Sequence, residues 1–153
     1  MSPLDSILEG LRKACSELEK AFGFEFEGLV LFGSWARGEA REDSDVDVLV
    51  VFKSLQGLKA RAKAYHLIWE HVKKPLTLVT ATTSDLARGA LTPLGLNIGF
   101  DGIVVCDRSG VLTKFKSEVL DFVEKYGLVR YRTSNGKYGW VRKDGKPLVE
   151  VIK

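Results

Sequence analysis

Apolar residues recur at helical spacing in several segments, and each segment carries signals for its ends. The first begins after Ser2, which fits a capping box with Asp5, and it stops at Gly23. Further helices are expected over 34–41, 54–73 and 112–126, with a short one from Ser84 to about residue 91. In the 54–73 helix, the pattern places these residues toward the core: Leu55, Leu58, Ala62, Tyr65, Ile68, Trp69 and Val72.

Short apolar runs alternate with these helices and predict strands. Four buried strands are expected, at 29–32, 45–52, 76–80 and 103–106. Residues 92–100 fit neither pattern clearly. Towards the end of the chain, Asn135-Gly136 and Asp144-Gly145 are tight-turn signals, and they predict a meander whose last strand is 148–152. The mixture indicates an α/β or α+β fold in which helices cover one sheet, followed by this C-terminal meander.

The composition fits one folded domain over residues 1–153. With 45% hydrophobic residues, the chain can bury a core without a metal or disulfide staple. It has no apolar run near the roughly 20 residues of a membrane-spanning helix, and its start lacks a signal-peptide pattern, so we expect a cytoplasmic protein. Cys15 and Cys106 form no CxxC pair, and we expect two buried thiols. Abundant charges and scarce Asn, Gln, Met and Cys favour a thermophilic source.

Positive charge concentrates in the C-terminal meander, about residues 127–153. Residues 126–153 hold seven Lys/Arg against Asp144 and Glu150, so this segment carries +5 and the rest of the chain −2. Such a segment could contact a nucleotide, RNA or an acidic partner, or it could be a solvated hairpin. Tyr138, Trp140 and Arg142 share one strand face, which could stack on a base but which we expect to pack on the last helix. The net charge of +3 is too small to indicate a nucleic-acid binder by itself.

The segment from residue 31 to residue 50 carries the candidate chemistry. A buried strand runs into Gly33-Ser34, where a helix begins, and free backbone N–H groups with a serine hydroxyl can hold a phosphate. Ten residues separate Ser34 from Asp45, and Asp47 follows two positions later on the same strand face. Paired carboxylates repel each other unless a cation lies between them, and oxygen ligands beside a phosphate favour Mg²⁺. Placing two acids in an apolar strand costs free energy, which a bound cation and phosphate would offset.

This segment resembles the Gly-Ser, ten residues, Asp-x-Asp signature of minimal nucleotidyltransferases in the DNA polymerase β superfamily. The likeness includes Arg37-Gly38 after Gly-Ser and Ser44 before the first acid, and it is specific over residues 29–51. It implies a nucleotidyltransferase fold with a mixed central sheet. It also implies that Gly33 and Ser34 hold a triphosphate, with Arg37 and Ser44 as further nucleotide-binding candidates. Arg37 could equally pair with Glu39 or Asp43. Asp45 and Asp47 would be the catalytic metal ligands, and a two-metal Mg²⁺ site is compatible with them.

The resemblance implies transfer of a nucleoside monophosphate, AMP from ATP, to an acceptor hydroxyl. The minimal group also implies a partner, a small helical HEPN-type protein of a toxin–antitoxin pair. One departure bears on turnover. Active members place a third acid on the next central strand, and here Thr77 occupies that position, unless Asp85 or Asp101 substitutes. Because threonine is no base, the alternative is a catalytically impaired subunit that binds a nucleotide or a partner.

Overall fold

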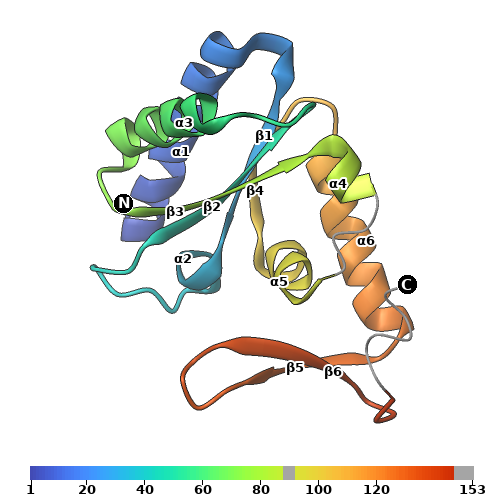
Figure 1. Cartoon of the computed structure of the whole chain (residues 1–153). Coiled ribbons are helices and arrows are strands. Elements are labelled where there is room, and N and C mark those ends of the chain that lie inside the picture. The colour runs from blue at the N-terminus through green and yellow to red at the C-terminus, as the bar shows by residue number, and fades with distance from the viewer. Residues whose placement is uncertain (88–91, 147–153) are drawn as a thin grey trace.

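The protein is built on one mixed four-stranded sheet (Figure 1). A computed structural model describes residues 1–87 and 92–146. The strand order is β3-β2-β1-β4, and β1 runs antiparallel to both of its neighbours while β3 runs parallel to β2. The strands are β1 (Phe26–Phe32), β2 (Val46–Phe52), β3 (Leu76–Thr82) and β4 (Ile103–Asp107). This is the mixed sheet covered by helices that the sequence predicts.

Helices cover both faces of the sheet and enclose two apolar clusters (Figure 1). One face carries α1 (Pro3–Phe22) and α3 (Leu58–Val72), and the other carries α4 (Thr83–Ala87), α5 (Pro93–Asp101) and α6 (Val111–Lys125). In β2, Val48 and Val50 contribute to the first cluster and Leu49 and Val51 to the second, as the period of a strand requires. The short helices η1 (Gly23–Glu25) and α2 (Gly33–Arg37) flank β1.

The end signals read from the sequence are confirmed at both ends of the first helix. The hydroxyl of Ser2 accepts from the backbone N–H of Asp5, and the Asp5 carboxylate accepts from the N–H of Ser2. The ambiguous segment 92–100 is helical, because Thr92 caps α5 through the N–H of Gly95 and Pro93 occupies the first turn. Within the described ranges, no helix is long and apolar enough to cross a bilayer.

The C-terminal segment forms a separate two-stranded hairpin of β5 (Leu128–Arg132) and β6 (Tyr138–Arg142). Its turn contains Gly136 at φ +83°, a conformation that glycine adopts without strain. Trp140 is buried against the second apolar cluster, and its indole N–H donates to Asn97 Oδ1 of α5 at 2.9 Å. The hairpin therefore packs on α5 as well as near the last helix. The predicted strand 148–152 lies outside the described residues.

The orientation predicted for the 54–73 helix is wrong in part. Helix α3 buries Ala64 and Ile68, whereas Leu58 is 86% exposed and Leu55, in the loop before the helix, is 89% exposed. Close packing of α1 against α3 accounts for this orientation. A Cβ at Gly10 of α1 would lie 2.5 Å from the carbonyl oxygen of His71, so the two helices approach closely. Other large apolar residues of α3 therefore remain on the side of the helix that faces solvent.

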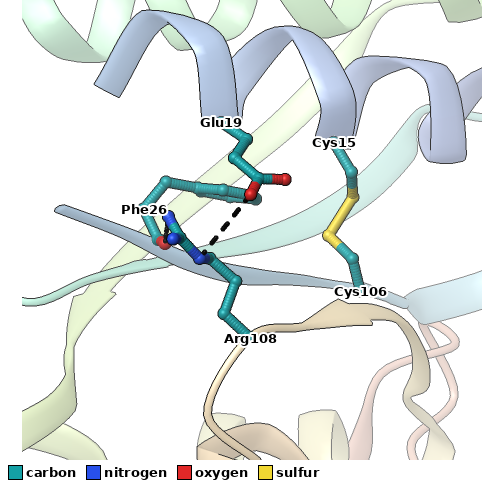
Figure 2. Close-up of a disulfide and its surroundings, with 5 residues drawn as sticks. All are labelled: Cys15, Glu19, Phe26, Cys106 and Arg108. Atoms are coloured by element: carbon teal, nitrogen blue, oxygen red, sulfur yellow. Dashed lines mark hydrogen bonds and ion pairs between the residues drawn. A yellow bond between two sulfur atoms is a disulfide. The ribbon is translucent and has the colours of Figure 1, made fainter. Parts of the chain in front are cut away.

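The expectation of two free thiols is also wrong, because Cys15 and Cys106 form a disulfide (Figure 2). The bond joins α1 to β4 across a sequence separation of 91 residues, with the two Cα atoms 6.6 Å apart. Sequence spacing gives no indication of this pairing, which arises because α1 packs across the sheet beside the edge strand. Nearby, the Arg108 guanidinium forms an ion pair with Glu19 at 3.8 Å, a second link between the same two segments.

Candidate functional site

Asp45 and Asp47 lie where β2 begins, between two neighbouring strands. Asp47 is paired in register with Phe32 of β1 on one side and with Thr77 of β3 on the other. The Thr77 hydroxyl donates to Asp45 Oδ2 at 3.5 Å, and it is close enough to the Asp47 carboxylate to act on its pKa as an alternative hydrogen-bond donor. Both carboxylates therefore converge on one side chain, as the alternation of strand residues predicts. Asp45 stands one residue before the strand and is exposed, while Asp47 is half-buried.

Gly33 brings the backbone of the next element against Asp47. Its φ is +74°, and a Cβ at this position would overlap the Asp47 carboxylate. Glycine is needed here both for its backbone angle and for space. Ser34 follows directly, in the first turn of α2, so the Gly-Ser pair and the aspartate pair lie at the same end of the sheet. The backbone of Gly33 therefore adjoins the Asp47 carboxylate.

The loop between α2 and β2 is held by two side chains of the motif. The indole N–H of buried Trp35 donates to the carbonyl oxygen of Ser44 at 3.1 Å. The Ser44 hydroxyl accepts from the backbone N–H of Arg41 at 2.8 Å. These contacts close the loop directly before Asp45. Ser44 thus has a local structural role that the sequence pattern did not reveal.

Arg37, at the end of α2, is engaged by carboxylates. It forms ion pairs with Glu39 at 2.8 Å and with Asp101 of α5 at 3.2 Å, and its guanidinium lies 4.4 Å from the centre of the Tyr138 ring. The Asp101 side chain is only 5% exposed and also pairs with Arg130 of β5 at 2.7 Å. Of the alternatives open for Arg37, the pairing with Glu39 is present, and the link to Asp101 was not foreseen.

A cleft of about 360 Å³ opens in front of these residues. Phe32, Gly33, Arg37 and Asp47 form one wall. A second part of the lining comes from α5 and from the β5–β6 hairpin, and its residues are Pro93, Leu94, Asn97, Gly136, Lys137 and Tyr138. The volume lies in the range of small-ligand sites. Residues more than 40 positions apart meet here, which explains why no local sequence pattern identified this second part.

The electrostatics of the pair suit a cation. Burial raises the pKa of the Asp47 carboxyl, and the negative charge of Asp45 raises it further, while the Thr77 hydrogen bond and Arg37 act in the opposite direction. A carboxylate in this position is costly when it stands without a cation. The donors are two carboxylates and a hydroxyl, all of them oxygen, which fits Mg²⁺ completing its shell with water and substrate phosphate. Asp45 and Asp47 could therefore hold such an ion.

A third acid beside the pair is missing from the part of the chain that the structure describes, where no group of three or more His, Cys, Asp or Glu could hold a metal. Asp101 is engaged by two arginines. The Asp85 carboxylate accepts from the N–H of Thr82, at the opposite end of β3 from Thr77. Among the described residues, the candidate site thus has two carboxylates with Thr77 beside them.

Comparisons with known proteins agree with this geometry. The family described as "Nucleotidyltransferase domain" matches residues 8–89. A putative protein adenylyltransferase of Methanocaldococcus jannaschii is 44% identical over 113 residues, which cover 74% of this chain and 69% of that protein. The protein adenylyltransferase MntA of Thermococcus cleftensis is 45% identical over 58 residues, 38% of this chain and 54% of that protein. The chain thus spans about half the length of some curated relatives that it matches.

A solved structure shares the fold at low sequence identity. It is a crystal structure of a toxin–antitoxin with AMP-PNP, and the two chains match with a TM-score of 0.52 and 16% identity over 74% of this chain and 87% of that chain. At this identity the likeness concerns the fold alone. It supports the sheet and helix arrangement that places Gly33, Asp45 and Asp47 together.

Proposed function

Because the chain belongs to the nucleotidyltransferase domain family, we propose that it transfers AMP from ATP to a hydroxyl group of a protein. The observation that carries this proposal is the contact of Gly33 with the Asp47 carboxylate, beside Thr77 and Asp45. A glycine-serine turn and a carboxylate pair at one end of a sheet are what a metal-bound triphosphate needs. The cleft in front of them has room for a small ligand.

Each motif residue receives a role in this proposal. Gly33 and Ser34 bind the triphosphate through the backbone and the Ser34 hydroxyl. Asp45 and Asp47 are the catalytic carboxylates and hold Mg²⁺, which when bound would offset the negative charge that develops in the reaction. Ser44 orders the loop before Asp45. Arg37 lines the cleft, and since Glu39 and Asp101 already engage its guanidinium, its main task is to hold α2 in place.

The proposed step is a displacement at phosphorus. The acceptor's hydroxyl oxygen forms a bond to the α-phosphorus of ATP. The bond from that phosphorus to the oxygen bridging it to the β-phosphorus breaks, and pyrophosphate leaves with the electron pair. The hydroxyl proton passes to water, because Thr77 cannot accept it and no third carboxylate adjoins the pair within the described residues. We therefore expect slow transfer unless the acceptor assists deprotonation.

The acceptor is proposed to be a side-chain hydroxyl of a partner protein. Relatives that match this chain at 44% and 45% identity are named protein adenylyltransferases, which supports a protein acceptor. The family resemblance of the motif points to a small helical HEPN-type partner. A toxin–antitoxin structure with AMP-PNP shares the fold, and this is compatible with such a pair.

Calorimetric titration with ATP tests the nucleotide site directly. Wild-type protein should bind ATP more tightly with millimolar Mg²⁺ than with EDTA. Asp45→Asn should reduce this difference while leaving the thermal unfolding of the protein nearly unchanged, because Asp45 is exposed. Asp43→Asn, in the same loop, is the matched control and should behave like the wild type. Binding that is independent of Mg²⁺, or equal in both variants, would refute the assignment.

A second candidate is a nucleotide-binding subunit that has lost turnover. The specific observation in its favour is Thr77 at the position between Asp45 and Asp47 where a third acid would stand. The two candidates predict the same Mg²⁺-dependent binding. They differ in whether label from ATP is transferred to the partner.

A further inference from the structure

The second part of the cleft lining is built by the C-terminal part of the chain. Residues 8–89 match the family, but Asn97, Gly136, Lys137 and Tyr138 lie beyond that match and line the same cleft as Gly33 and Asp47. In Figure 1 the hairpin lies across the end of the molecule where α2 and α5 are found. The candidate site is thus completed by elements that the matched domain does not contain.

Several contacts fix the hairpin in this position. Asp101 of α5 pairs with Arg37 of α2 at 3.2 Å and with Arg130 of β5 at 2.7 Å, and both bonds use the same carboxylate oxygen. The Tyr138 hydroxyl donates to the Glu39 carboxylate, at 2.9 Å from its nearer oxygen. Ion pairs with a side chain as buried as Asp101 have defined geometry, since solvent cannot replace them easily. The hairpin turn is therefore held over the cleft.

Lys137 is the cation that this arrangement presents to a ligand. It lines the same cleft as Asp47, its side chain is exposed, and within residues 1–87 and 92–146 its ammonium has no ion-pair partner. The other cationic side chain that lines the cleft, Arg37, is held by Glu39 and Asp101. In a cleft whose lining includes Asp47, a metal would offset the carboxylate charge, and the phosphates of a bound nucleotide would be the counterpart of the ammonium group.

Tyr138 is less suited to contact the nucleotide. The guanidinium groups of Arg37 and Arg130 each lie 4.4 Å from the centre of its ring. A base that stacked on this ring would have to compete with those cations. The aromatic residue of the hairpin therefore serves to dock it, which leaves the neighbouring Lys137 as the candidate for contact with a ligand.

We propose that Lys137 binds the β- and γ-phosphates of the nucleoside triphosphate, so that the C-terminal hairpin holds the pyrophosphate leaving group. This inference rests on the proposed function, because it assigns a residue of the same site. It predicts selectivity for a triphosphate over a monophosphate, since an AMP molecule lacks the groups that Lys137 contacts. Lys137 would act by charge, so arginine should replace it in part.

The test compares three variants by calorimetry with Mg²⁺ and either ATP or AMP. Lys137→Ala should weaken ATP binding by roughly 10- to 100-fold, the range for a hydrogen bond to a charged group, and leave AMP binding unchanged. Lys137→Arg should restore much of the affinity for ATP. Lys143→Ala is the matched control, because Lys143 lies on the same hairpin with its side chain near Gly127 and outside the cleft lining. It should bind like the wild type.

The outcomes separate this inference from the proposed function. If wild-type protein binds Mg²⁺-ATP and Lys137→Ala binds it equally well, the inference is overturned and the proposed function stands. If Lys137→Ala weakens ATP and AMP binding by the same factor, the assignment to the outer phosphates is overturned. If the wild type does not bind Mg²⁺-ATP, the proposed function itself fails. Thermal unfolding of each variant shows whether a loss of binding comes from loss of fold.

Discussion

Substituting Gly33 by alanine should disturb the carboxylate pair without touching either acid. Gly33 has φ +74°, and an added Cβ would overlap the Asp47 carboxylate. A non-glycine residue in the left-handed region costs about 1–2 kcal/mol. The overlap comes in addition, and it is relieved only if Asp47 moves away from its position beside Thr77. We expect Gly33→Ala to lower the free energy of unfolding by more than the backbone term alone.

Gly38 provides a matched control at the other end of the same short helix. Its φ is +77°, nearly that of Gly33, but a Cβ there would meet no atom within 4 Å. Gly38→Ala should therefore lose only the backbone term, about 1–2 kcal/mol. Urea denaturation of the two variants separates strain in the backbone from displacement of the carboxylate.

The same pair of variants tests the site. Loss of one interaction with a charged group costs about 1.5–3 kcal/mol of binding free energy. Mg²⁺-dependent ATP binding of Gly33→Ala should thus fall by about 10- to 100-fold relative to Gly38→Ala, measured by calorimetry at a temperature where both are folded. Equal affinities in the two variants would refute the reasoning, because they would mean that the position of Asp47 does not matter for the ligand.

Three further predictions concern other parts of the account. Since burial raises the pKa of Asp47, its charged form destabilises the folded metal-free protein, so Asp47→Asn should raise the melting temperature at pH 7. The gain should shrink as pH falls through the raised pKa and be gone below the ordinary aspartate value of 3.8, and an unchanged or lowered melting temperature at pH 7 would contradict the burial argument. Reduction of the Cys15–Cys106 bond should lower the free energy of unfolding by about 4–5 kcal/mol, the value that the chain-entropy treatment gives for a loop this long. Urea denaturation with and without reductant measures this change, and an unchanged free energy of unfolding would argue against the bond. Thr77→Asp should raise the rate of label transfer at millimolar Mg²⁺, by up to ~10²–10⁴-fold if general-base help is the missing component, and a slower variant would place the base elsewhere.

Much of the site could be predicted because its two halves are local. Gly33-Ser34 and Asp45-x-Asp47 are each a short pattern at a strand end, and the ladder that pairs Phe32 with Asp47 brings them together. The position of Thr77 followed from the next apolar run, and its contact with both acids agrees with that alignment. Strand periodicity and helix-end signals depend only on residues close together in the sequence, so they can be predicted directly from it.

The remaining features depend on how distant elements pack, and no local pattern encodes that. The disulfide joins residues 91 positions apart, and the Arg37–Asp101–Arg130 bridge joins three separate elements. The face that α3 buries was assigned wrongly because its large apolar residues outnumber the small ones. Ile68 is buried as predicted, but with α1 approaching closely at Gly10 the helix also buries the small Ala64 and leaves Leu58 exposed. The proposed role of Lys137 likewise depends on the hairpin, whose residues line the cleft far from the motif in sequence.

Incubation with ATP labelled at either the α- or the γ-phosphate tests the central claim most directly. The proposed acceptor in this assay is a HEPN-type protein, and Asp45→Asn serves as the inactive control. The account predicts that the partner retains label from the α-phosphate and none from the γ-phosphate, that the transfer requires Mg²⁺, and that the variant abolishes it. Retention of the γ-label, or α-label transfer that survives both EDTA and Asp45→Asn, would contradict the assignment of this site to nucleotidyl transfer.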